Sequence, residues 1–242
     1  MSKLSLHKSD NPSKNPPEEL QTSIFNRFSK VPRRTESVVY EFTDDRALLH
    51  QYYHLRETMY RKVFRTDKFV GEEDLHDKIS HILVARRGKL VVGGCRLTIR
   101  DGDEDFLLPM ETPDFRLRRL FKELSLNKLR HSEVSRFAVM DDDDDHLDIM
   151  MVLSQLTFEK CVDAEVAYSF LKSSLPMARN WRRIIQTRCG QPNVRIRTDI
   201  AVPENPIHPE INWYITEVPL PASQTALLHE GTLVRPAESL VH

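Results

Sequence analysis

Apolar side chains recur at three- and four-residue spacing between residues 45 and 64, which predicts a helix with one apolar face. The residues of that face are Leu48, Tyr52, Leu55, Met59 and Val63. Thr43 and Asp44 precede the pattern and are the candidate N-caps.

Two apolar runs rich in β-branched residues follow, over residues 79–86 and 89–100. A tight turn at Arg87–Gly88 joins them, and so short a connection predicts an antiparallel hairpin. Gly93 and Gly94 stand inside the second run, where glycine indicates a bulge or a close approach of other atoms to the backbone.

The rest of the chain alternates the two kinds of pattern. Helices are predicted over residues 114–129, 147–163 and 175–188, the last of them ended by Cys189–Gly190. Strands are predicted over residues 132–140, 165–171, 193–200 and 212–218. This order predicts an α/β fold, with a mixed twisted sheet of about six to seven strands flanked by helices.

Composition divides the chain into three segments. Residues 1–35 hold four prolines and many polar side chains, which predicts a flexible N-terminal arm with a short helix near residues 20–28. Residues 36–221 carry the helix and strand patterns and are predicted to form one domain. Residues 222–242 are weakly patterned and are expected to be a C-terminal extension.

Charge narrows the class of protein. The 242 residues include 35 basic and 36 acidic side chains, so a strongly basic nucleic-acid-binding protein is disfavoured. No apolar run reaches the roughly 18 residues of a membrane helix, and the N-terminus lacks the apolar core of a secretory signal. Cys95, Cys161 and Cys189 show no CxxC spacing and indicate reduced structural thiols. We expect a cytoplasmic protein without stable membrane insertion.

Two polar clusters precede the middle of the chain. Glu72, Glu73, Asp74 and Asp77 lie in a loop, and composition alone favours a solvated acidic loop. Arg96 lies in an apolar strand, where alternation lets it share a face with Gly94 and Thr98. Its guanidinium then either faces a ligand or lies in solvent on an edge strand.

A third cluster is the segment EVSRF. Glu133 and Ser135 share one face of the predicted strand, and Val134 and Arg136 share the other unless a bulge intervenes. A carboxylate on a central strand can act as a general base, directly or through water. A purely structural Glu–Arg pair is the alternative.

The fourth cluster is the aspartate run at residues 141–145, which is typical of an exposed loop. It lacks the glycine and the final glutamate of an EF-hand, so no specific metal site is predicted. The sequence contains no GxSxG, GxGxxG, P-loop or HExxH motif.

Taken in order, these clusters resemble the bacterial acyl-homoserine-lactone synthase (autoinducer synthase) family, from about Leu48 to Leu220. The matching segments are LRETMY with Arg56 and Tyr60, EEDLHD with Asp74 and Asp77, GCRL with Arg96, EVSRF with Glu133, Arg136 and Phe137, and TRCGQPNVRI.

The resemblance implies a fold related to the GCN5-type N-acyltransferases, with a V-shaped cleft between splayed strands. It also implies a quorum-sensing reaction in which the amino group of S-adenosylmethionine attacks an acyl thioester of acyl carrier protein or coenzyme A. The methionyl part then forms a lactone and expels methylthioadenosine. Both small molecules are substrates, and no cofactor is implied.

The resemblance also implies roles for individual residues. Glu133 and Arg96 are the implied catalytic residues, with Glu133 helping to remove a proton from the amine. The side chains implied to form the S-adenosylmethionine side of the site are Arg56, Tyr60, Asp74, Asp77, Arg136 and Phe137. Tyr168 and Ser169 are the implied acyl-pocket residues.

Charge distribution favours acyl carrier protein as the donor. The aspartate run stands where coenzyme-A-dependent relatives bind a diphosphate, and it would repel one. Residues 172–198 hold seven basic and no acidic side chains, a composition that suits an acidic carrier protein or an ordinary solvated helix. The candidate docking residues are Arg179, Arg182, Arg183 and Arg188.

Departures from the family pattern keep other functions open. A tryptophan expected after the first helix is missing, with Phe69 as a possible substitute, and Tyr60 replaces a phenylalanine. One alternative is a long-chain N-acyl amino acid synthase, which acylates a free amino acid. Another is a non-catalytic module that keeps the fold and binds a partner. An ordinary acetyl-CoA N-acetyltransferase conflicts with the aspartate run.

Overall fold

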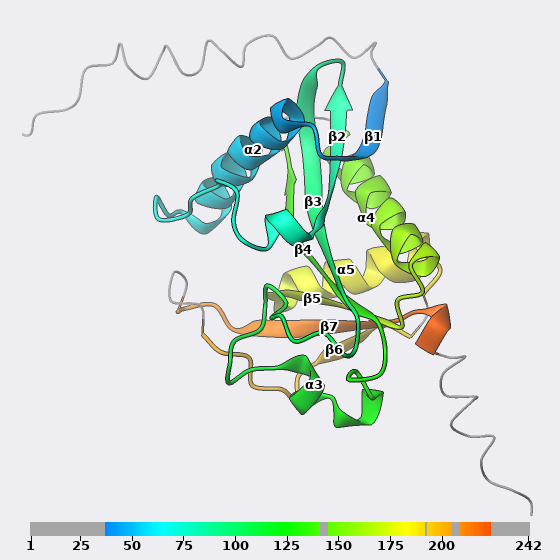
Figure 1. The fold of residues 1–242 in the computed structure, drawn as a ribbon. Coiled ribbons are helices and arrows are strands. Elements are labelled where there is room, and N and C mark those ends of the chain that lie inside the picture. Colours follow the sequence, from blue (N-terminus) through cyan, green and yellow to red (C-terminus); the bar gives the residue numbers. More distant parts are fainter. Residues whose placement is uncertain (1–36, 141–144, 192, 205–208, 224–242) are drawn as a thin grey trace, which may run out of the picture. The chain divides into compact units, whose positions relative to one another are not determined.

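A computed structural model describes residues 37–140, 145–191, 193–204 and 209–223 (Figure 1). Its strands are β1 (Val38–Thr43), β2 (His81–Arg87), β3 (Leu90–Arg100), β4 (His131–Val139), β5 (Tyr168–Ser174), β6 (Arg195–Arg197) and β7 (Trp213–Pro219). Its α-helices are α2 (Arg46–Phe64), α3 (Leu117–Leu120), α4 (His146–Asp163) and α5 (Leu175–Arg188).

The strands form one seven-stranded sheet in the order β1-β2-β3-β4-β5-β7-β6. Only the β4–β5 pair is parallel among these strands. Helix α2 packs on one face, where Tyr52 and Leu55 contact Ile82 and Val84. Helices α4 and α5 cover the opposite face (Figure 1). The predicted mixed α/β sheet is confirmed.

Strands β4 and β5 separate after a short stretch of pairing. They pair only from His131–Tyr168 to Glu133–Phe170, although β4 continues to Val139 and β5 to Ser174. Beyond Glu133, the side of β4 that is turned toward β5 therefore has no strand paired with it, although both strands lie at the centre of the sheet. This divergence is the splaying of strands that the sequence resemblance implies.

A β-bulge interrupts β4 just beyond the point of divergence. Arg96 pairs with Ser135 and Gly94 pairs with Ala138, so two residues of β4 lie opposite Cys95 alone. Arg136, one of these two, has a left-handed backbone with φ of 59°. The bulge resets the alternation of side chains, which the sequence left open, and brings Arg136 to the same face as Glu133.

The glycine pair in β3 marks two close approaches, as the sequence indicates. A Cβ atom on Gly94 would lie 2.6 Å from the Tyr52 ring, and one on Gly93 would lie 2.9 Å from Ile149. Helices α2 and α4 therefore press against the same short stretch of β3 from opposite faces.

The prediction of a helix over residues 114–129 is wrong. The structure has a single turn there, α3, and a 3₁₀ turn at Lys122–Leu124, and Ser125 has a left-handed φ of 50°. The segment instead packs its apolar side chains against β5 and β7 from several directions. These buried side chains are Phe115, Leu117, Phe121, Leu124 and Leu126.

Smaller boundaries also differ from the prediction. Strand β1 was missed, and Asp45 rather than Thr43 or Asp44 caps α2 by accepting hydrogen bonds from the amides of Ala47 and Leu48. The hairpin turn lies one residue later, with Gly88 at φ of 56°. Strand β5 starts three residues later than predicted, and the predicted strand 193–200 shortens to β6.

Two of the three cysteines are buried and all three are free. Burial raises the pKa of the Cys95 and Cys161 thiols to about 12, so they remain protonated. Among the described residues, no helix is long and apolar enough to cross a membrane.

Candidate active site

A row of polar side chains crosses the α2 face of the sheet where β3 and β4 run side by side. Alternation places Arg96, Thr98 and Arg100 on that face of β3, and their partners on β4 are Ser135, Glu133 and His131. All but Ser135 are buried. Buried polar groups require partners, and these are found in the loops that cover the row.

Asp77 joins the two arginines that the sequence singled out. Arg56 donates to both carboxylate oxygens of Asp77, at 2.9 and 2.7 Å, and Arg96 donates to it at 3.1 Å. Arg56 and Arg96 are each 1% exposed. Helix α2, the acidic loop and β3 are therefore tied together by one buried carboxylate.

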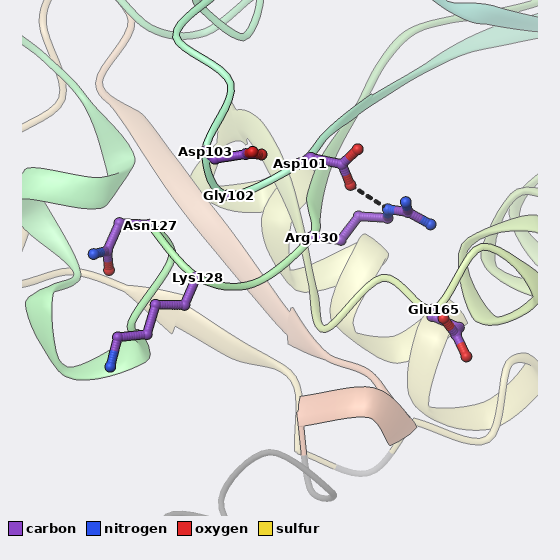
Figure 2. A pocket seen from close by; sticks show the side chains of 7 residues that line it. All are labelled: Asp101, Gly102, Asp103, Asn127, Lys128, Arg130 and Glu165. Carbon is purple, nitrogen blue, oxygen red and sulfur yellow. Dashed lines mark hydrogen bonds and ion pairs between the residues drawn. The ribbon is translucent and has the colours of Figure 1, made fainter.

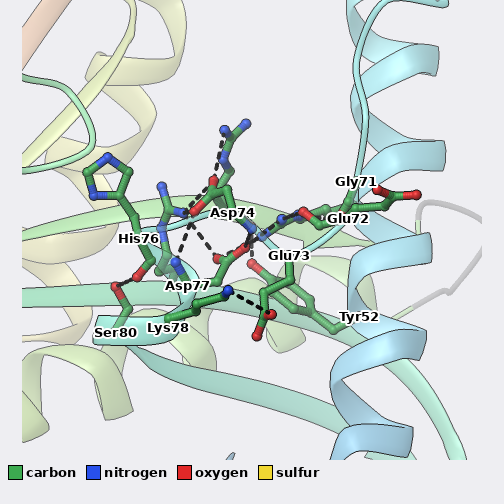
Figure 3. Close-up of polar contacts among 12 residues, drawn as sticks. Tyr52, Gly71, Glu72, Glu73, Asp74, His76, Asp77, Lys78 and Ser80 are labelled. Atoms are coloured by element: carbon green, nitrogen blue, oxygen red, sulfur yellow. Dashed lines mark hydrogen bonds and ion pairs between the residues drawn. The ribbon is translucent and has the colours of Figure 1, made fainter.

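Asp74 completes the network from the solvent side. Arg96 donates to both of its oxygens at 2.8 and 2.9 Å. The amide of each aspartate also donates to the carboxylate of the other, at 2.9 Å in both directions (Figure 3). Although partial burial raises it, the Arg96 guanidinium holds the pKa of Asp74 below its usual range. The sequence alone favoured a solvated acidic loop. Glu72 and Glu73 are indeed exposed, whereas the two aspartates are partly or fully buried.

Arg136 lies over two aromatic rings at the edge of this network. Its guanidinium carbon is 5.0 Å from the centre of the Phe69 ring and 5.8 Å from that of Tyr60, and these rings stack at 4.6 Å. Its ion pair with Asp74 is long, at 3.6 Å. Phe69, which the sequence suggested as a substitute for the missing tryptophan, therefore forms an aromatic pair with Tyr60 beneath Arg136.

Glu133 is the buried carboxyl group of the row. Its side chain accepts a 2.6 Å hydrogen bond from the amide of Met110. Burial raises its pKa to about 7, although Arg96, the Met110 amide and Arg136 oppose the shift. A carboxyl group with this pKa can accept a proton near neutral pH, which is the property a general base needs.

A second buried network was missed by the sequence reasoning. Arg100 donates to Glu111 at 2.6 and 3.2 Å and to Nε2 of His131 at 2.7 Å. Because arginine only donates, His131 is neutral and its Nδ1 donates to the carbonyl of Leu129, in line with a pKa lowered to about 4 by burial. The alternation of Arg96, Thr98 and Arg100 along β3 could have marked Arg100 as a residue on the same face as Arg96. Nothing in the sequence marked Glu111, which comes from the irregular segment.

This second network fixes the segment that touches Glu133. Glu111 accepts hydrogen bonds from the amides of Leu108 and Leu117. The amide between them along the chain, that of Met110, is the donor to Glu133. Arg100 and Glu111 therefore hold in place the backbone group that binds the candidate base.

Three predicted site residues lie elsewhere. Phe137 faces α5, where its ring lies 4.4 Å from that of Trp181. Ser169 faces α4, within a hydrogen bond of Ser132, whereas Tyr168 packs on the opposite face against the irregular segment. The structure therefore separates the two candidate acyl-pocket residues by the thickness of the sheet.

The candidate docking arginines form two groups. Arg179, Arg182 and Arg183 are exposed on α5 at spacings that share one side of a helix. Arg188 lies on roughly the opposite side of the helix axis and borders a depression with Glu159 and Asp163 of α4.

Two other features lie away from the polar row. Of the aspartate run, only Asp145 is among the described residues, and it pairs with Arg87 at 2.8 Å. A surface depression of about 330 Å³ is lined by Asp101, Arg130 and Glu165 (Figure 2). Charged surface side chains line it, and Arg130 is paired with Asp101. No group of His, Cys, Asp and Glu side chains in the described part of the chain is arranged to hold a metal ion.

The sheet with its divergent central strands is the GCN5-related acyltransferase fold, which confirms the predicted fold class. No protein-family model and no curated protein matches the sequence. Among solved structures, FeeM, an N-acyl amino acid synthase from uncultured soil microbes, is similar with a TM-score of 0.55 and 11% identity, covering 81% of this chain and 99% of its own.

Two further structures share the fold. The AHL synthase LasI has a TM-score of 0.52 and 16% identity, covering 83% of this chain and 99% of its own. BjaI, a CoA-dependent acyl-homoserine lactone synthase determined with SAM and isopentyl-CoA, has a TM-score of 0.50 and 17% identity, covering 81% and 89%. At these identities the likeness concerns the fold.

Proposed function

We propose that the protein is an N-acyltransferase that moves an acyl group from a thioester to an amine, with Glu133 as the general base. The observation that carries this proposal is the buried carboxyl group of Glu133, with a pKa of about 7, at the residue where β4 and β5 separate. The fold supports the proposal, because three proteins with similar structures are described as an N-acyl amino acid synthase and two acyl-homoserine lactone synthases.

The reaction requires one proton to be moved. The amine nitrogen attacks the thioester carbonyl carbon, the C–N bond forms, and the C–S bond breaks to release a thiol. Glu133 removes the proton that the attacking nitrogen must lose, and the departing sulfur takes up a proton in the product. General-base assistance of this kind contributes about 10²- to 10⁴-fold to a rate.

The arginine–aspartate network holds the acceptor side of the site. Arg96 and Arg56 are neutralised by Asp74 and Asp77, so their role in this proposal is to position the acidic loop and the Tyr60 and Phe69 rings beside Glu133. Arg136 is the least satisfied cation of the network, because its ion pair measures 3.6 Å. It is therefore the member of the network available to contact a substrate.

Two amine acceptors fit this chemistry. With S-adenosylmethionine the product is an acyl-homoserine lactone, formed when the acylated methionyl carboxylate displaces methylthioadenosine. The residues that support it are Arg56, Asp74, Asp77, Arg96, Glu133 and Arg136, which match the synthase motifs. With a free amino acid the product is an N-acyl amino acid. The missing tryptophan and the structural likeness to FeeM support this second acceptor.

The exposed side of α5 supports the proposal that the acyl donor is carried by an acidic protein. Arg179, Arg182 and Arg183 face solvent together, and none of them has an ion-pair partner among the described residues. Acyl carrier protein is an acidic partner that such a surface would attract at long range. Arg188 is not part of this surface, because acidic residues of α4 lie beside it.

One assay tests the proposal and its alternatives. Purified protein is mixed with acyl carrier protein or coenzyme A thioesters and with S-adenosylmethionine or each amino acid, and the products are identified by mass spectrometry. We expect an amide product and faster turnover with the carrier-protein donor. Methylthioadenosine release identifies the lactone synthase, and an N-acyl amino acid identifies the second candidate. No product from any pair would favour a non-catalytic binding module.

A further inference from the structure

Lys172 and Trp213 lie beside the candidate base on the same face of the sheet. Phe170 is the register partner of Glu133, and Lys172 is two residues further along β5. Across β5 and β7, Ser174 pairs with Trp213, so alternation places Trp213 on this face as well. The two residues therefore stand on the far side of the point where β4 and β5 separate.

Each side chain carries a hydrogen-bond donor that has no acceptor among the described residues. The Lys172 ammonium lies 5.7 Å from the centre of the Trp213 ring and forms no ion pair with a described residue. The indole nitrogen of Trp213 is shielded from solvent and has no acceptor among the described residues. An unpaired buried donor such as the Trp213 indole nitrogen is uncommon in folded proteins, and the Lys172 ammonium beside it belongs to a partly buried side chain.

Except for Arg136, whose ion pair with Asp74 is long, the arginines on this face are paired with carboxylates. Arg56 and Arg96 are paired with aspartates, Arg100 is paired with Glu111, and Arg197 is paired with Glu217 at 2.8 Å. Lys172 differs from them because it forms no ion pair with a described residue, although burial lowers its pKa and the charge of Glu133 opposes that shift. An anion that enters beside Glu133 would therefore meet Lys172 as a free cation.

A row of aromatic rings connects this pair to the arginine network. Phe69 stacks on Tyr60, Tyr60 lies 5.6 Å from Phe64, and Phe64 lies 6.2 Å from Trp213. Arg136 stands over one end of the row and Lys172 over the other. A substrate held against this wall would have a cation at each end.

We propose that Lys172 and the indole N–H of Trp213 bind the carboxylate of the amine acceptor, so that the acceptor is an amine that also carries a carboxylate. This inference rests on the proposed acyl transfer. In an α-amino acid the amine is two bonds from the carboxylate, so a carboxylate bound at Lys172 keeps the nitrogen on the Glu133 side of β5.

The chemistry of the bound carboxylate bears on the product. An ammonium that holds a carboxylate reduces the nucleophilicity of its oxygens. Lactone formation from S-adenosylmethionine needs that carboxylate as a nucleophile. The Lys172 site therefore favours a product that keeps its free carboxylate, an N-acyl amino acid.

The test compares acceptors that differ only at the carboxylate. Binding of S-adenosylmethionine and of a panel of amino acids, each beside its carboxamide, is measured by calorimetry on the wild type, Lys172→Met and Trp213→Phe. Charge-assisted hydrogen bonds predict about 10- to 100-fold weaker binding of the carboxylate form to Lys172→Met. Lys172→Arg should retain most of the affinity, and Trp213→Phe should lose a smaller part of it.

The control is Lys160→Met. Lys160 lies 5.9 Å from the Phe42 ring and so has a similar cation–aromatic contact away from this site. Carboxylate-dependent binding that Lys172→Met loses and Lys160→Met keeps supports the proposal, whichever acceptor binds. Equal effects on acid and carboxamide, or no effect on either, would overturn it. Because binding is read without turnover, failure of the catalytic proposal would appear separately, as an absence of product with the wild type.

Discussion

Asp77 accepts four hydrogen bonds where solvent does not reach, from Arg56, from Arg96 and from the amide of Asp74. Asp74, three residues earlier, remains one-third exposed. Their sequence spacing gives no reason to rank them, and both were predicted as site residues. Burial makes them different, because removing the buried Asp77 carboxylate leaves the Arg56 guanidinium without its counter-charge and leaves Arg96 with Asp74 alone.

Asp77→Asn is predicted to lower the free energy of unfolding by about 3–5 kcal/mol, the usual cost of breaking a buried ion pair. Asp74→Asn is predicted to cost about 1 kcal/mol, because solvent screens an exposed pair. Urea unfolding of both variants measures the difference. Equal losses would show that Asp77 is not the centre of the network.

At the same scale, the sequence located some side chains and could not locate others. Arg96 and Glu133 were placed on the correct strands because the apolar runs around them were predicted correctly. The mutual arrangement of Ser135 and Arg136 stayed open because alternation alone does not reveal a bulge. Glu111 was missed because a side chain anchored from an irregular segment leaves no periodic signal.

Among the elements, β3 is the most constrained, because α2 and α4 both pack against its glycines. The sequence indicated a bulge or close contact at Gly93–Gly94, and the contacts with Tyr52 and Ile149 supply the reason. The helix predicted at residues 114–129 failed for the opposite reason. Its apolar residues are buried on several sides against β5 and β7, so their spacing imitated a helical face without forming one.

Gly94→Ala is predicted to destabilise the fold by about 3 kcal/mol, since the new methyl group would meet the Tyr52 ring at 2.6 Å and the Leu83 carbonyl at 2.9 Å. Gly190→Ala is the matched control. Gly190 has nothing within 4 Å of the new atom, and its φ of 65° costs an alanine about 1 kcal/mol. The temperature of thermal unfolding should therefore fall further for Gly94→Ala than for Gly190→Ala. A similar fall for both variants would mean that α2 moves away at little cost.

At the scale of the whole molecule, the parts of the proposed site come from segments far apart in the sequence. Helix α2 and the acidic loop supply the arginine–aspartate network, β4 supplies Glu133, the irregular segment supplies the Met110 amide, and β5 and β7 supply Lys172 and Trp213. The order of elements predicted the sheet, because strand and helix patterns are local. The position of Lys172 opposite Glu133 depends on strand order and register, which no local pattern contains.

The pH dependence of acyl transfer by the wild type and by Glu133→Gln tests the central claim most directly. Because the base must be ionised, the ratio of the wild-type kcat/KM to that of Glu133→Gln should rise with pH through an apparent pKa near 7 and then level off. Glu133→Gln should be slower by about 10²-fold or more, and its own profile should lack that inflection. Ionisation of the acceptor amine affects both proteins equally.

The same variant should unfold at no lower a temperature than the wild type above pH 7. Burial raises the folded-state pKa of Glu133, so the ionised carboxylate is the destabilising form, and a neutral amide removes that cost. A folded Glu133→Gln protein with the wild-type rate and pH profile would contradict the assignment of Glu133 as the general base.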